Sequence, residues 1–252
     1  MCAWRRSLAT FHQLNQIVHE ASKRQKMRFV FLTLTTRNVQ GNELSKTLDK
    51  LFQAWQRLSQ RKAFRDVVIG WFRALEVTRN DRRFSNWYGT YHPHFHVLLA
   101  VKPSYFTRLY IKQAEWVELW RKSLRVDFTP IVDVRAVKPK RKGQTVEAAV
   151  AESGKYAVKP DDYIIKGNQE ETDEAVRTFD GSLKNRRLVA YGGLFREIRK
   201  ELQLVDPEEA DLVHIDEESE EPCNCSVCQS EMMKEVYRWH IGLSDYILHE
   251  EE

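Results

Sequence analysis

Apolar residues recur along this chain at spacings that alternate between strand and helix patterns. Residues 28–36, 70–78 and 131–137 have the composition of strands, and a polar loop at 80–90 leads from the second of these into another strand-forming stretch. Two amphipathic helices are predicted by apolar residues three and four apart: Leu44, Leu48, Leu51, Trp55 and Leu58, then Tyr110, Ala114, Val117, Trp120 and Leu124. This order predicts an α+β fold, in which helices pack on one antiparallel sheet.

Three histidines stand at every second position in residues 92–98, directly before an apolar run. Because a strand repeats its side-chain direction every two residues, His94 and His96 point to the same side. Two adjacent imidazoles form half of a metal site. An amphipathic strand with a histidine face is the alternative, but the chain has only 8 histidines, and three of them here favour the metal. His92 is the weakest candidate, since Pro93 places it at or before the strand start.

Glu76 lies on the preceding predicted strand, and hairpin geometry decides whether it reaches the histidines. Pairing it with His94 or His96 centres the turn at residue 85 or 86, inside the polar loop. The carboxylate then joins both imidazoles on one face, provided that the register is even. Two histidines and one carboxylate leave positions open on Mg²⁺ or Mn²⁺ for a substrate oxygen. Taken alone, Glu76 is typical of a solvent-facing strand carboxylate.

Residues 147–159 are rich in alanine, have helical spacing and stop at Pro160. Glu152, Tyr156 and Lys159 share one face of this predicted helix. Tyrosine is a poor nucleophile at its usual pKa of about 10, and a metal-polarised phosphate with an ammonium group nearby is a setting that activates it. A lone tyrosine is more often a half-buried aromatic, but its position beside Glu152 and Lys159 favours catalysis.

These segments, in this order, resemble the rolling-circle replication initiators (Rep proteins) of small Gram-positive plasmids, which are HUH endonucleases. The matching stretches are residues 31–35 (Phe-Leu-Thr-Leu-Thr), 94–96 (His-Phe-His), 152–159 (Glu-Ser-Gly-Lys-Tyr-Ala-Val-Lys) and 187–195 (Arg-Leu-Val-Ala-Tyr-Gly-Gly-Leu-Phe). The resemblance covers about residues 2–200. It implies a central antiparallel sheet of about five strands.

The resemblance also implies a reaction and roles for its residues. Tyr156 attacks single-stranded origin DNA and becomes a phosphotyrosine on the 5′ side of the nick, which frees a 3′-hydroxyl for a host polymerase. Lys159 and Lys155 balance phosphate charge, and Glu152 activates water in a terminating second cleavage. The chain has no Gly-x4-Gly-Lys-[Ser/Thr] loop for nucleotide binding, so we expect it to use a host helicase.

The charge distribution agrees with a DNA partner. Residues 1–205 hold 38 Lys and Arg against 21 Asp and Glu, a net charge of +17, whereas residues 206–252 hold 2 against 15, a net charge of −13. A region with this much positive charge attracts the phosphate backbone of a nucleic acid. Candidate contacts are Arg24, Lys26, Arg28, Lys138, Lys140, Arg141, Lys142, Lys155, Lys184, Arg186 and Arg187, with Trp71, Trp87 and Tyr88 available to stack bases. Any single cluster is equally typical of a solvated surface.

Beyond the basic region, residues 206–221 hold nine carboxylates and no Lys or Arg, which is typical of a solvated linker. Three thiols follow within six residues, and without an export signal they favour structural zinc over disulfides. These ligands are Cys223, Cys225 and Cys228, and the fourth is Cys2, His214 or His240. Rep proteins often carry a Cys-x-x-Cys pair before Trp-Arg-Arg; here Cys2 alone precedes that triplet, as in an N-terminally shortened version. The alternative is a flexible cysteine cluster without metal.

We therefore predict a nicking and joining domain at residues 1–205, an acidic linker at 206–221 and a cysteine-containing segment at 222–252. The apolar runs fall short of the roughly 18 residues of a membrane helix, and the basic N-terminus lacks the apolar core of a signal peptide, so we expect a cytoplasmic protein. An HUH relaxase or transposase would share the same site and differ in its substrate. A non-catalytic, zinc-containing regulator that binds DNA or RNA is the rival from another class.

Overall fold

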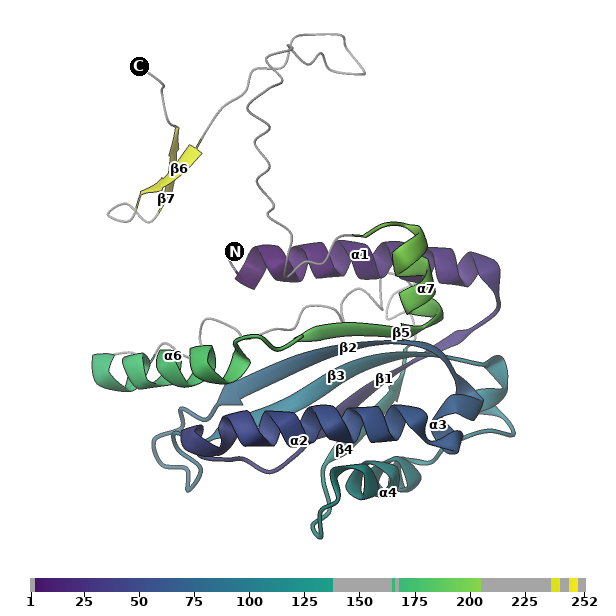
Figure 1. The fold of residues 1–252 in the computed structure, drawn as a ribbon, viewed down its shortest axis with the longest axis horizontal. Coiled ribbons are helices and arrows are strands. Elements are labelled where there is room, and N and C mark those ends of the chain that lie inside the picture. Colours follow the sequence, from purple (N-terminus) through teal and green to yellow (C-terminus); the bar gives the residue numbers. More distant parts are fainter. Residues whose placement is uncertain (1–2, 138–164, 166–167, 205–236, 241–244, 249–252) are drawn as a thin grey trace. The chain divides into compact units, whose positions relative to one another are not determined.

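In the computed structural model, a five-stranded antiparallel sheet forms the centre of the unit that holds residues 1–210 (Figure 1). Its strand order is β4-β1-β3-β2-β5. The strands are β1 (Arg28–Thr35), β2 (Val68–Arg79), β3 (Tyr91–Val101), β4 (Val132–Ala136) and β5 (Val189–Gly193). The prediction of an α+β fold with one antiparallel sheet of about five strands is confirmed.

The structure describes residues 3–137, 165, 168–204, 237–240 and 245–248, and the side chains of those between 9 and 204. The chain divides into two units, Met1–Ala210 and Asp211–Glu252. Of the second unit, the structure describes one antiparallel hairpin of β6 (Tyr237–His240) and β7 (Asp245–Leu248). The predicted boundaries at residues 205 and 221 lie outside the described residues and stay predictions. No helix in the described ranges is both long enough and apolar enough to cross a membrane.

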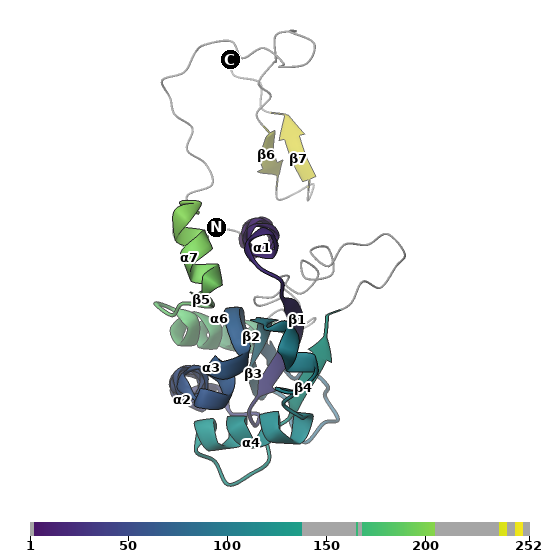
Figure 2. The ribbon, with the colours of Figure 1, turned by 90° about the vertical axis from the view of Figure 1, so that its right-hand side faces the viewer.

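Helices cover both faces of the sheet (Figures 1 and 2). On one side lie α2 (Gly41–Gln60), α3 (Lys62–Val67) and α4 (Gln113–Leu124), and α6 (Gln169–Leu183) packs beside α2. On the other side lie α1 (Ala3–Arg24) and α7 (Leu194–Glu201). The α1 helix was not predicted, although its buried residues Leu14, Ile17, Val18 and Ala21 have helical spacing.

Side chains alternate along β2 and β3 between two apolar cores. Leu75, Val77, Phe95, Val97 and Leu99 belong to the core that includes α2 and α4. Their neighbours Phe72, Ala74, Leu98 and Ala100 belong to the core that includes α1 and α7. Burial on both faces explains why the end of β3 is a continuous apolar run.

The predicted helix in residues 44–58 is confirmed, and all five of its apolar positions are buried in α2. The predicted face of the next helix is partly wrong. Tyr110 and Ala114 are exposed, and Tyr110 precedes the first residue of α4. Trp116 takes their place in the core, because the large indole ring buries more apolar area and its Nε1 donates a hydrogen bond to Tyr105 Oη at 3.0 Å.

The Gly-Gly pair in residues 187–195 is explained by close approaches to β2. A Cβ atom on Gly192 would lie 2.1 Å from the Trp71 ring, and one on Gly193 would lie 2.3 Å from the Ile69 carbonyl oxygen. Gly193 also has a φ of +54°, a conformation that disfavours other residues. The two glycines therefore let β5 pair closely with β2 and turn directly into α7.

Candidate metal centre

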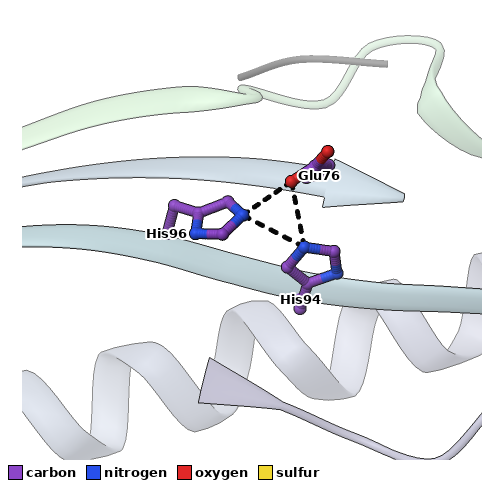
Figure 3. Close-up of side chains that lie close together, drawn as sticks. All are labelled: Glu76, His94 and His96. Carbon is purple, nitrogen blue, oxygen red and sulfur yellow. Dashed lines mark hydrogen bonds and ion pairs between the residues drawn. The ribbon is translucent and has the colours of Figure 1, made fainter. Parts of the chain in front are cut away.

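Glu76, His94 and His96 point toward one another on the face of the sheet that also carries α1 and α7 (Figure 3). Glu76 comes from β2 and pairs directly with His94 on β3, so the register is even, which is the condition that the hairpin argument required. His94 Nε2 lies 3.0 Å and His96 Nε2 lies 2.6 Å from Glu76 Oε2, and the two nitrogens are 3.1 Å apart. The cluster begins where the apolar side chains of this face, Ala74 and Leu98, end.

The spacing of these three atoms suits a divalent cation. Adjacent ligands of an octahedral ion with bonds of about 2.1 Å are about 3 Å apart, and the observed separations are 2.6 to 3.1 Å. Three ligands on one side of the ion leave the remaining positions open to a substrate. The residues therefore fit a metal of the predicted kind.

Hydrogen bonds outside the cluster orient both imidazoles. His94 Nδ1 donates to the carbonyl oxygen of His92 at 3.1 Å, and His96 Nδ1 lies 3.4 Å from Thr33 Oγ1. With a metal bound, Nδ1 of each ring would keep its hydrogen and Nε2 would turn its lone pair toward the ion. Phe31 stacks on the His96 ring at 5.5 Å between centroids with an interplanar angle of 18°.

The roles of Phe31 and Thr33 were missed from the sequence, although both lie in the stretch 31–35, which matches the Rep proteins. The sequence signal for these roles is that Phe31 and Thr33 are two residues apart and therefore face the same side of β1. Because β1 pairs with β3, Thr33 lies opposite His96. That pairing joins residues far apart in the chain. Residues 31–35 therefore hold a histidine in place as well as contributing a strand to the sheet.

Glu76 is ionised in this environment. Burial alone would raise the pKa of this carboxyl group, but the hydrogen bonds from His94 and His96 outweigh it and hold the pKa well below its usual range. A buried carboxylate concentrates negative charge, which a cation would neutralise.

His92 lies outside this cluster. Its Nδ1 is 2.9 Å from Asn38 Oδ1, so its side chain bonds to the segment that follows β1. Burial lowers the pKa of His92, and the neighbouring His94 lowers it further. The third histidine therefore supports the cluster through its backbone carbonyl rather than through its ring.

Several predicted site residues lie outside the described residues, and their roles stay predictions. They are Tyr156, Glu152, Lys159 and Lys155 of the predicted nucleophile helix, the basic residues Lys138, Lys140 and Arg141, and Cys2, Cys223, Cys225, Cys228 and His214 of the predicted zinc site. His240 is in β6, of which only the backbone is described.

Arg186, a predicted DNA contact, is engaged within the fold. Its guanidinium forms an ion pair with Asp49 and donates to Ser45 Oγ at 2.9 Å and to the carbonyl oxygen of Ser182 at 2.7 Å. These bonds tie the end of α6 to α2. The Arg187 side chain is exposed, while its carbonyl oxygen accepts a hydrogen bond from the buried Arg73 at 3.0 Å. The DNA contacts of both arginines stay predictions.

The predicted stacking residues differ in their surroundings. Trp71 is half-buried and packs edge-on against Trp55, with ring centroids 4.8 Å apart. Tyr88 donates its hydroxyl hydrogen to Glu171. Trp87 is exposed, and so is Phe84, which the sequence did not single out.

Comparison with known proteins gives one consistent similarity. Residues 1–247 match the model of a family described as "Replication protein". A "Protein rep" of Bacillus amyloliquefaciens is 42% identical over 98% of this chain and 74% of its own length. A "Protein rep" of Streptococcus pneumoniae serotype 2 is 44% identical over 88% of this chain and 67% of its own length. A "Replication protein" of Staphylococcus aureus is 37% identical over 82% of this chain and 87% of its own length. No solved structure matches the chain.

Proposed function

The chain belongs to the replication protein (Rep) family, and from this premise we propose that it initiates plasmid replication by nicking one strand of single-stranded origin DNA. The convergence of Glu76, His94 and His96 is the observation that carries the proposal. Two neutral imidazoles and one carboxylate make a site with a single negative charge, which suits a divalent cation with phosphate as a further ligand.

Mg²⁺ or Mn²⁺ held by these three side chains would polarise the scissile phosphate. The chain supplies the orientation: Thr33 and the His92 carbonyl group hold the imidazoles, and β2 holds the carboxylate. Because the three ligands come from two paired strands, their spacing is set by the ladder of backbone hydrogen bonds and needs little adjustment on binding.

In this proposal Tyr156 is the nucleophile. Its phenolic oxygen gives up its proton and forms a bond to phosphorus, the bond from phosphorus to the 3′ oxygen breaks, and that oxygen takes up a proton to become the 3′-hydroxyl. Lys155 and Lys159 balance the charge of the phosphate, and Glu152 activates water in the terminating cleavage. A host polymerase extends the 3′-hydroxyl, and a host helicase separates the strands. Structural zinc on Cys223, Cys225, Cys228 and Cys2 is part of the same proposal.

The geometry argues against a purely structural role for the cluster. A buried carboxylate is costly unless it is paired, and well-packed apolar residues would stabilise the sheet at least as well. A relaxase or transposase would use the same residues, but the relatives named above are replication proteins.

The experiment that tests the nucleophile is peptide mapping of the covalent adduct. The protein is incubated with Mn²⁺ and a labelled single-stranded origin oligonucleotide, and the modified peptide is identified by mass spectrometry. We expect the nucleotide on Tyr156, and we expect Tyr156→Phe to bind DNA without forming an adduct. A nucleotide on Tyr163 or another tyrosine would contradict the assignment.

A further inference from the structure

The loop that joins β2 to β3 exposes two large aromatic rings to solvent. Phe84 is fully exposed, and Trp87 is 57% exposed. Arg82 and Arg83 precede them and are exposed as well, whereas Asp81 is the one carboxylate of residues 80–90. Exposure of large apolar rings to water is unfavourable, and burial against a partner would relieve it. Two such rings within four residues therefore indicate a binding surface.

Hydrogen bonds hold this loop in one conformation. The Gly89 backbone N–H donates to Asn80 O at 2.8 Å, and the Asn80 N–H donates to Thr90 O at 2.9 Å, which closes the base of the loop. Within it, the Ser85 N–H donates to Arg82 O at 2.8 Å and the Tyr88 N–H to Ser85 O at 3.0 Å. The exposure of the rings is therefore a property of an ordered loop.

A clamp to α6 fixes which side of the loop faces outward. Tyr88 donates its hydroxyl hydrogen to Glu171 Oε2, and Arg79 Nη2 forms an ion pair with the same oxygen at 3.2 Å. The Arg79 guanidinium also lies over the Tyr88 ring, 5.5 Å from its centroid. The Tyr88 side chain is therefore held by contacts within the fold, whereas the neighbouring Trp87 ring is exposed and accessible to an external partner.

The loop lies close to the candidate metal centre along the hairpin. After the pair of Glu76 and His94, three residue pairs follow, ending with Arg79 and Tyr91. At about 3.3 Å per residue, these pairs separate the cluster from the loop base by about 10 Å along the strands. Because the loop is held to α6 on the opposite face of the sheet, a single strand of DNA with one phosphate at the metal centre would pass over the end of the sheet to place neighbouring nucleotides at the loop.

We propose that the loop of residues 80–90 binds single-stranded DNA beside the metal centre, with bases stacked on Phe84 and Trp87 and phosphates paired with Arg82 and Arg83. The inference rests on the proposed function for the identity of the partner. The pairing of exposed aromatic rings with two arginines favours nucleic acid over a protein partner, because stacking and phosphate pairing together are the chemistry of single-strand binding.

The test measures binding of the full chain to a fluorescein-labelled oligothymidylate in chelator, so that no cleavage contributes. We expect Phe84→Ala and Trp87→Ala each to weaken binding about 5-fold or more, and the double variant to weaken it further. Phe84→Tyr and Trp87→Phe keep a ring and are expected to bind nearly as wild type. Tyr110→Ala removes a similarly exposed ring near α4 and is the matched control.

A salt titration tests the arginines separately. Each phosphate contact contributes about 0.7 to the slope of log affinity against log salt for a single strand. Replacing both Arg82 and Arg83 by Ala is therefore expected to reduce that slope by about 1.4. An unchanged slope would contradict the phosphate contacts.

The outcomes separate this inference from the proposed function. If the Phe84→Ala/Trp87→Ala variant binds the oligonucleotide as tightly as wild type, the loop is not a DNA surface, whether or not the protein nicks DNA. If the variant loses binding while the wild type forms no covalent adduct with Mn²⁺, the stacking surface stands and the nicking proposal is wrong.

Discussion

Glu76 Oε2 lies 2.6 Å from His96 Nε2, although these residues are diagonal neighbours in the hairpin. Glu76 is directly opposite His94, and Ala74 is opposite His96. The small side chain of Ala74, opposite His96, leaves room for the imidazole to reach diagonally toward the carboxylate. One oxygen atom is thereby shared by two imidazoles, and the three donor atoms come to the spacing that a divalent ion requires.

Metal affinity is expected to depend on His94 and His96. Removing either imidazole deletes one of three ligands, so His94→Ala or His96→Ala should weaken Mn²⁺ binding by more than about 10-fold, measured by isothermal titration calorimetry. His92→Ala is the matched control, because its ring lies outside the cluster while its carbonyl group remains. Equal loss of affinity in all three variants would contradict the assignment of ligands.

The ionised state of Glu76 predicts a pH-dependent stability in the metal-free protein. Its pKa in the folded state is below the ordinary value of 4.5, so its stabilising effect is complete above that value and is lost as the pH falls toward the folded-state pKa. Glu76→Gln should lower the free energy of unfolding by about 1 to 3 kcal/mol at pH 7.

The difference in the free energy of unfolding between wild type and Glu76→Gln should shrink as the pH is lowered from 6 to 3. Urea denaturation at each pH measures it. A difference that grows toward acid would mean that the carboxyl group is protonated in the folded protein.

Arg186 is expected to stabilise the fold. Arg186→Ala removes the bonds to Asp49 and Ser45, so it should lower the free energy of unfolding by about 1 to 2 kcal/mol, whereas the exposed Lys184→Ala should change it little. Urea denaturation measures both. If Arg186→Ala keeps full stability but loses DNA affinity, the residue acts mainly as a DNA contact.

Glu152 separates termination from initiation in the proposed reaction. Glu152→Ala should leave the first nick and the covalent adduct nearly intact, because Tyr156 performs that step, but it should let replication run past one unit length. Plasmid products resolved by gel electrophoresis report the length. Loss of the first nick in a variant that still folds and binds DNA would assign Glu152 to the metal or to activation of Tyr156.

The sequence predicted the parts of the site that depend on local geometry. The position of the polar loop limited the partner of Glu76 to His94 or His96 if the register is even, and in the structure Glu76 pairs with His94. The support from Phe31 and Thr33 could not be predicted, since it depends on the long-range pairing of β1 with β3.

Helix faces were predicted less well than strands. The stripe expected for α4 included Tyr110 and Ala114, but the packing of Trp116 against Tyr105 sets the observed face. The α1 helix carried a detectable apolar stripe, and its layer on the second face of the sheet depends on contacts with α7 that are distant in sequence.

The central claim, metal-dependent nicking at the Glu76, His94 and His96 cluster, is tested most directly by adduct formation with and without metal. Wild-type protein and His96→Ala are incubated with a labelled single-stranded origin oligonucleotide, in Mn²⁺ or in chelator, and separated on a denaturing gel. We predict a denaturation-resistant adduct for wild type in Mn²⁺, none in chelator, and a loss of orders of magnitude for His96→Ala. Equal adduct formation by the wild type in chelator, or full activity of His96→Ala, would contradict the account.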